Sequence, residues 1–185
     1  MQGNNLKDQD ASKLNRRKFL TRTGAGFVIA SLPAKSVWAS SNGLAGSIMA
    51  SGHASDFAGG NDLVFQKAEF FRQFEHELKK VTFSHYFGGN IFNSEGRVSN
   101  STNITLWQII QDKSRHKGKD DINLTLVTLL LNAVFNNKHG IFYPVIGTSS
   151  FKTDKNFASH IYNLAVKDVH NTARVLKHFL ANPNH

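Results

Sequence analysis

The sequence contains no cysteine among its 185 residues. Without thiolates the chain can form no disulfide, no cysteine-held iron–sulfur cluster and no thioether-attached haem. A copper site with a cysteine ligand and a cysteine nucleophile are excluded for the same reason. We therefore expect no cofactor in this chain, and any that it did hold would depend on histidines, carboxylates or a non-covalent pocket.

A long apolar run is also missing. A helix that spans a membrane needs about 20 predominantly apolar residues. The longest apolar run in the first forty residues, Gly24 to Pro33, is about half that length. We therefore expect no stable transmembrane span in this part of the chain.

Two adjacent arginines precede this short run. Arg16 and Arg17 belong to the segment NRRKFL, in which Lys18, Phe19 and Leu20 follow them. The segment resembles the core of a bacterial twin-arginine (Tat) export signal, which has two arginines, a polar residue and then Phe-Leu. The resemblance implies that the Tat translocase is a partner during export and that it recognises Arg16, Arg17, Phe19 and Leu20.

The residues behind the arginine pair complete the layout of an export signal. A weakly apolar region is followed by Val37, Trp38 and Ala39, a small-residue exit of the kind that precedes signal cleavage. Cleavage is expected between Ala39 and Ser40, which gives a periplasmic protein. The Tat pathway carries proteins that have already folded, often because a cofactor or a partner must be acquired in the cytoplasm.

The positive charge of the chain is concentrated in this leader. The formal net charge is +9, but residues 1–39 hold seven basic and two acidic residues, which leaves +4 for the rest. The one basic cluster beyond the leader, Lys113 to Lys119, is followed at once by Asp120 and Asp121. We interpret the cluster as a solvated loop and expect no nucleic-acid partner.

The chain divides by composition into three parts. Residues 1–39 form the predicted signal peptide, and residues 40–60, rich in Ser, Gly and Ala, form a predicted flexible linker. Residues 61–185 carry helical periodicity, and we predict that they form one mainly α domain without internal repeats.

Four helices are predicted within this domain. They cover residues 63–82 with Asp62 as N-cap, 99–114 with Ser101 or Thr102 as N-cap, 121–136, and 154–180. A strand remains an alternative near residues 104–107, because Ile, Thr and Trp also favour strands. The helix over 121–136 is apolar nearly all round, which predicts a central position. Residues 141–147 contain Pro144 and are expected to be extended over the core.

Nine histidines invite a test for metal binding. Two imidazoles share a helix face when they are three or four residues apart, and no pair on a predicted helix has this spacing. His160 and His178 would lie on one face of a continuous helix, but about 27 Å apart. We therefore predict no metal site, and leave a small metal-assisted enzyme using His76 or His85 as one alternative.

Aromatic residues are frequent, and several adjoin predicted turns. The segments FSHYFGG and GIFYP place rings beside glycine or proline, where full burial is difficult. Aromatic side chains are enriched at protein interfaces. We predict that a partner interface includes Phe83, Tyr86, Phe87, Phe142 and Tyr143.

Two segments of the domain resemble a known family. TLVTLLLNAVFNN (Thr125 to Asn137) and Ile161 to Ala165 are similar to segments of the small subunits of bacterial membrane-bound flavin dehydrogenases for sorbitol, fructose or gluconate. Val134 and Phe135 stand where Trp and Tyr occur in that family. The resemblance implies a non-catalytic subunit whose export signal serves a large dehydrogenase subunit, and any flavin would lie in that subunit.

Three functions are therefore carried forward from the sequence. The first is a non-catalytic exported subunit or maturation partner of a periplasmic, membrane-associated oxidoreductase. The second is a free-standing periplasmic binding protein. The third is the small metal-assisted enzyme, and finding metal in the purified protein would favour it.

The arginine pair gives a direct test of targeting. Replacing Arg16 and Arg17 by Lys keeps the charge but removes the planar guanidinium groups, so we expect the double variant to stay in the cytoplasm. Cell fractionation and immunoblotting measure the exported share. Normal export of the variant would show that a general secretory route is used instead.

Overall fold

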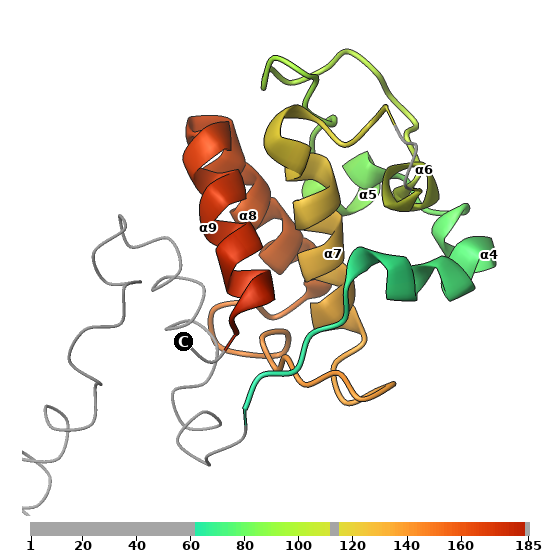
Figure 1. Ribbon diagram of the computed structural model, residues 1–185, viewed down its shortest axis with the longest axis vertical. Helices are drawn as coiled ribbons and strands as arrows, with labels where there is room; N and C mark the ends of the chain where they lie inside the picture. The colour runs from blue at the N-terminus through green and yellow to red at the C-terminus, as the bar shows by residue number, and fades with distance from the viewer. Residues whose placement is uncertain (1–61, 112–114, 184–185) are drawn as a thin grey trace, which may run out of the picture. The chain divides into compact units, whose positions relative to one another are not determined.

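The computed structural model describes residues 62–111 and 115–183. The predicted signal peptide and linker, with their recognition and cleavage residues, lie outside the described residues. The described part contains six α-helices, two 3-10 helices and three isolated β-bridges, with no longer strand. The expected mainly α fold is confirmed (Figure 1). No helix in this part of the chain has the length and apolar character needed to cross a membrane.

Three helices pack together around the core. They are α7 (Ile122–Val134), α8 (Asp154–Lys167) and α9 (Val169–Ala181). All three contact one another, and Figure 1 shows α7 with α8 and α9 beside it. Eleven of the thirteen residues of α7 are buried. The central position predicted from its apolar sequence is therefore confirmed.

The last predicted helix is divided in two. Asp168 has an extended backbone conformation, with φ −156° and ψ 94°, and separates α8 from α9. Its carboxylate accepts a hydrogen bond from the backbone N–H of Asn171 at 3.0 Å, which caps α9. The prediction of one helix over 154–180 was therefore wrong. The apolar residues continue with helical spacing across the break, so this spacing alone did not show that Asp168, a strong N-cap residue, starts a new helix.

The first predicted helix is shorter than expected. Residues 62–67 are not helical, and Val64 forms an antiparallel bridge with Phe142 through two backbone hydrogen bonds of 3.0 and 2.9 Å. A 3-10 helix, η1 (Ala68–Phe74), then leads directly into α4 (Glu75–Leu78). Asp62 is therefore not the helix N-cap, because pairing with residue 142 holds this segment extended.

Two short helices lie between α4 and the core helix α7. One, α6 (Leu106–Ile110), begins at a capping box in which Thr105 and Gln108 each bond the backbone of the other. The predicted caps Ser101 and Thr102 were wrong, since the T-x-x-Q pattern starts later. The other, α5 (Phe83–Phe87), was not among the predicted helices, and it ends at Gly88, whose φ of 72° suits glycine.

Two polar contacts from α9 hold the turn that precedes α7. A short 3-10 turn, η2 (Lys119–Asp121), precedes it, and both Asp120 and Asp121 have positive φ values, 52° and 55°. His170 Nδ1 lies 2.8 Å from the carboxylate of Asp120, and Lys177 Nζ lies 3.0 Å from that of Asp121. The bond from His170 lowers the pKa of Asp120. These contacts connect α9 to the turn that starts the central helix.

A buried asparagine of α7 holds the segment around residue 92. Asn123 is fully buried, and its side-chain oxygen accepts a hydrogen bond from the backbone N–H of Phe92 at 2.9 Å. Its amide nitrogen donates to the carbonyl oxygens of Phe92 and His116 at 2.7 and 2.8 Å. One side chain therefore supplies hydrogen-bond partners to two irregular segments, around residues 92 and 116.

A second buried asparagine, Asn132, pairs with an irregular segment of backbone at the other end of α7. Asn132 accepts from the backbone N–H of Gln66 at 2.7 Å and donates to the Gln66 carbonyl at 2.9 Å. Beyond the helix, Asn136 accepts from the backbone N–H of Tyr143 at 2.8 Å. The residues of α7 thus position the extended chain that enters the domain and the loop that follows the helix.

Removing the first of these clamps tests its contribution. Asn123→Ala would leave the buried N–H and C=O groups of Phe92 without their Asn123 partner, so we expect the free energy of unfolding to fall by about 2–4 kcal/mol. Urea unfolding of the variant measures this change in the free energy of unfolding. Asn163→Ala, at an exposed position of α8, is the matched control and should stay close to the wild type. Equal losses in both variants would contradict the clamp.

Candidate functional site

The predicted interface aromatics do not all lie at the surface. Phe83, Phe87 and Tyr143 are 1–2% exposed, so the expectation that they form an exposed patch was wrong. Phe83 and Phe87 are one helical turn apart in α5 and stack with ring centroids 4.1 Å apart, on the side that packs against α8. The rings were expected beside a turn, but they belong to a short helix that directs both of them into the core.

Tyr143 is buried because residues 141–146 alternate between the interior and the surface. Its ring meets Phe65 edge to face, with centroids 4.9 Å apart, and it also contacts Phe179. Burial raises the pKa of its hydroxyl group. Phe142, its neighbour, is half-buried and pairs with Val64 through its backbone.

Tyr86 is the predicted interface residue that lines a surface hollow. We call this hollow the apolar pocket. It has a volume of about 160 Å³ and lies where α4, α6 and α7 meet the Tyr86 ring. Burial, and to a smaller extent Asp154, raises the pKa of Tyr86. The pocket is lined by Phe74, Glu77, Leu78, Val81, Tyr86, Leu106, Leu130, Leu131, Val134 and Phe135.

The apolar pocket opens at the end of the central helix. Val134, the last residue of α7, is 36% exposed, and the ring of Phe135 lies 4.6 Å from that of Phe74. A cavity of roughly 150 Å³ with an apolar lining holds a benzene molecule. The pocket is therefore the right size for one aromatic or leucine side chain, and apolar contact is what its lining provides.

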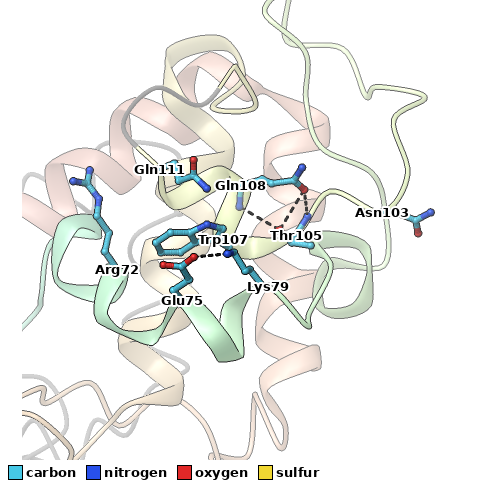
Figure 2. A pocket seen from close by; sticks show the side chains of 8 residues that line it. All are labelled: Arg72, Glu75, Lys79, Asn103, Thr105, Trp107, Gln108 and Gln111. Carbon is cyan, nitrogen blue, oxygen red and sulfur yellow. Dashed lines mark hydrogen bonds and ion pairs between the residues drawn. The ribbon is translucent and has the colours of Figure 1, made fainter.

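A second, larger hollow is lined mainly by polar and charged residues. We call it the polar groove; Figure 2 shows eight side chains that line a volume of about 920 Å³. Glu75 and Lys79 form an ion pair one turn apart on its wall, and the Lys79 ammonium lies 5.8 Å from the centre of the Trp107 ring. In this view Gln111 lies close to Trp107, and Asn103 lies farther away, beyond Thr105.

The two hollows share the same two helices. Glu75 and Lys79 line the polar groove, whereas Glu77 and Leu78 line the apolar pocket. On α6, Trp107 contributes to the groove and Leu106 to the pocket. We refer to the surface that contains both hollows as the α4 face. An apolar centre beside a polar region is the usual composition of a protein interface.

The histidines are dispersed. His76 on α4 and His85 on α5 are exposed, and the ring of His85 packs edge to face with Tyr86 at 5.3 Å. His160 and His178 lie on different helices, so the separation predicted along one continuous helix does not apply. Within residues 62–111 and 115–183, no group of three or more metal-ligating side chains is placed to hold an ion.

His160 differs from the other histidines by its partial burial. Its ring lies 5.1 Å from that of Phe151, and its Nε2 atom is buried with no hydrogen-bond partner among the described residues. Burial, and secondarily the charge of Lys167, lowers the pKa of His160. The fold therefore favours the neutral form of this side chain over the charged form.

Most residues of the α4 face were not identified as functional from the sequence. Phe74 and Leu78 fall within the predicted helix over 63–82 with no functional role assigned, and Asn103 and Gln111 carry no local motif. Val134 and Phe135 stood out through the family resemblance alone. Comparisons with protein-family models, with curated proteins and with solved structures found no match to this chain.

The burial of His160 predicts a pH dependence of stability. A histidine with a lowered pKa in the folded state stabilises the protein above its ordinary pKa, about 6.5. Stability should therefore decrease as the pH falls below this value, until the lowered pKa is passed. His160→Gln should reduce the difference between the melting temperatures at about pH 7.5 and pH 5. His76→Gln controls for the loss of an imidazole, and an unchanged difference in the His160 variant would contradict the prediction.

Proposed function

We propose that this protein is an exported, non-catalytic subunit or maturation partner that binds another protein through the α4 face. The observation that carries the proposal is the apolar pocket. It is lined almost entirely by apolar side chains, it is open to the surface, and it has room for one large side chain. Binding energy at protein interfaces is concentrated in such pockets, where a single anchor residue of the partner is fully desolvated.

The sequence gives support for the same function that is independent of the pocket. The twin-arginine segment implies export of a folded passenger, and a folded passenger can carry a bound partner with it. The family resemblance implies that this partner is the large flavin subunit of a periplasmic, membrane-associated oxidoreductase. The first segment that carries the resemblance contains Val134 and Phe135, and both residues line the apolar pocket.

The exposed valine of the pocket provides the sharpest test. Val134→Lys places a charged group at the mouth of the pocket, and the loss of a desolvated anchor contact typically costs 2 kcal/mol or more, or about 30-fold in affinity. We expect recovery of the partner with the tagged protein from periplasmic extract to fall accordingly. The melting temperature should change little, because the side chain is 36% exposed.

A matched control lies on another helix of the core. Val166 of α8 is 51% exposed and lines neither hollow, so Val166→Lys should leave recovery of the partner unchanged. Mass spectrometry identifies the recovered protein, which should be a larger oxidoreductase subunit. The proposal is wrong if no protein depends on Val134 for its recovery, or if both lysine variants lose it equally.

A further inference from the structure

A third hollow lies where the chain enters the domain, and we call it the entry groove. It has a volume of about 570 Å³ and lies between α7, the C-terminal end of α9 and residues 65–69. It shares no lining residue with either hollow of the α4 face. The entry groove is therefore a separate surface, to which the proposed function assigns no role.

The floor of the entry groove is apolar. Phe65, Leu124 and Leu180 line it, and all three are half-buried side chains that pack against the core. Among the leucines of α7 and α9, Leu124 and Leu180 alone are half-buried rather than buried. The hydroxyl groups of Thr125 and Thr128 donate to backbone carbonyls of their own helix at 3.0 and 2.7 Å, so neither is free to donate to a ligand.

The charges around the entry groove balance. Lys67 and Lys177 stand against Glu69 and Asp121, and Lys177 Nζ lies 3.0 Å from the carboxylate of Asp121. A surface with an apolar floor and no net charge favours an occupant that is apolar and uncharged, because an unpaired charge would lose its hydration there without gaining a partner.

The sequence just before the described domain has this chemistry. Residues 40–55 contain no lysine, arginine, aspartate or glutamate. They consist mostly of Ser, Gly and Ala, and their three large apolar residues, Leu44, Ile48 and Met49, fall within six positions. A spacer composed for solubility alone needs no such cluster.

We propose that the segment Leu44–Met49 docks into the entry groove of its own chain, with Ile48 and Met49 against Leu124 and Leu180. The chain between Met49 and Asp62 can span about 40 Å when extended, and Phe65, three residues further on, already lines the groove. A tethered segment has an effective concentration of about millimolar, so even a weak site fills with it before a separate protein or a second copy.

Docking of this segment depends on the folded domain. The entry groove is formed by residues 65–69, by α7 and by the end of α9, which come together only when these elements pack. The segment lies directly behind the predicted signal peptide, so docking holds the end of the leader near the domain once the domain has folded. The inference does not use the α4 face and is independent of the proposed function.

Disulfide trapping tests the docking in the full-length chain. The protein has no cysteine, so the introduced pair is the only source of a disulfide. Ser47→Cys combined with Ala181→Cys places one thiol beside Ile48 and the other at an exposed residue that lines the groove. The control pair is Ser47→Cys with Val166→Cys, because Val166 is exposed on α8 and does not line the groove. Under mild oxidation we expect the first pair to close at least about tenfold faster, measured on non-reducing gels.

A second variant tests which side chains hold the segment. Ile48→Ser and Met49→Ser, added to the pair at positions 47 and 181, remove the apolar groups and leave the tether unchanged. Burial of a large apolar side chain contributes about 1.5–3 kcal/mol, so we expect the rate of disulfide closure to fall at least about tenfold.

Three results would overturn the inference. Equal closure rates at positions 181 and 166 would show that the segment has no preferred site. A closure rate that the two serines leave unchanged would show that Ile48 and Met49 do not hold it. Disulfide-linked dimers as the main product at position 181 would assign the groove to a second copy. Recovery of the partner through Val134 is a separate measurement, so the proposed function stands or falls on its own.

Discussion

The fold depends on backbone pairing by the buried asparagines of its central helix. Much of the described chain is neither helix nor sheet, yet polar backbone groups cannot be buried without partners. Asn123 and Asn132 provide these partners from within α7, nine residues apart and both fully buried. The hydrophobic surface of α7 orders α8 and α9 around it, while its two amides determine where the irregular segments can lie.

The α4 face follows from this arrangement. Asn132 fixes the chain at Gln66, and the bridge between Val64 and Phe142 keeps the preceding residues extended. The chain then has only a 3-10 turn and one short helix in which to cross the end of α7. Side chains of such a short element cannot cover the whole end of α7, so Val134 stays partly exposed and the apolar pocket remains open beside it.

Apolar periodicity predicted the mainly α class, the central helix and the approximate extent of the helical segments around it. It did not predict the break at Asp168 or the capping box at Thr105, because one polar residue with the right backbone geometry decides a helix boundary. The site was less predictable. Of the five expected interface rings, Phe83, Phe87 and Tyr143 are buried, since ring direction depends on tertiary packing. Tyr86 does line the pocket, but its other walls combine residues more than 50 positions apart, which local pattern does not reveal.

The central claim is that this protein works by holding another protein against its α4 face. Site-specific photo-crosslinking in living cells measures this most directly, with a benzophenone amino acid placed at position 134 or, for comparison, at position 166. The account predicts one dominant crosslinked product from position 134, in the periplasmic fraction, and none of that product from position 166. Crosslinking to the same product from position 166 alone, or none from position 134, would contradict it.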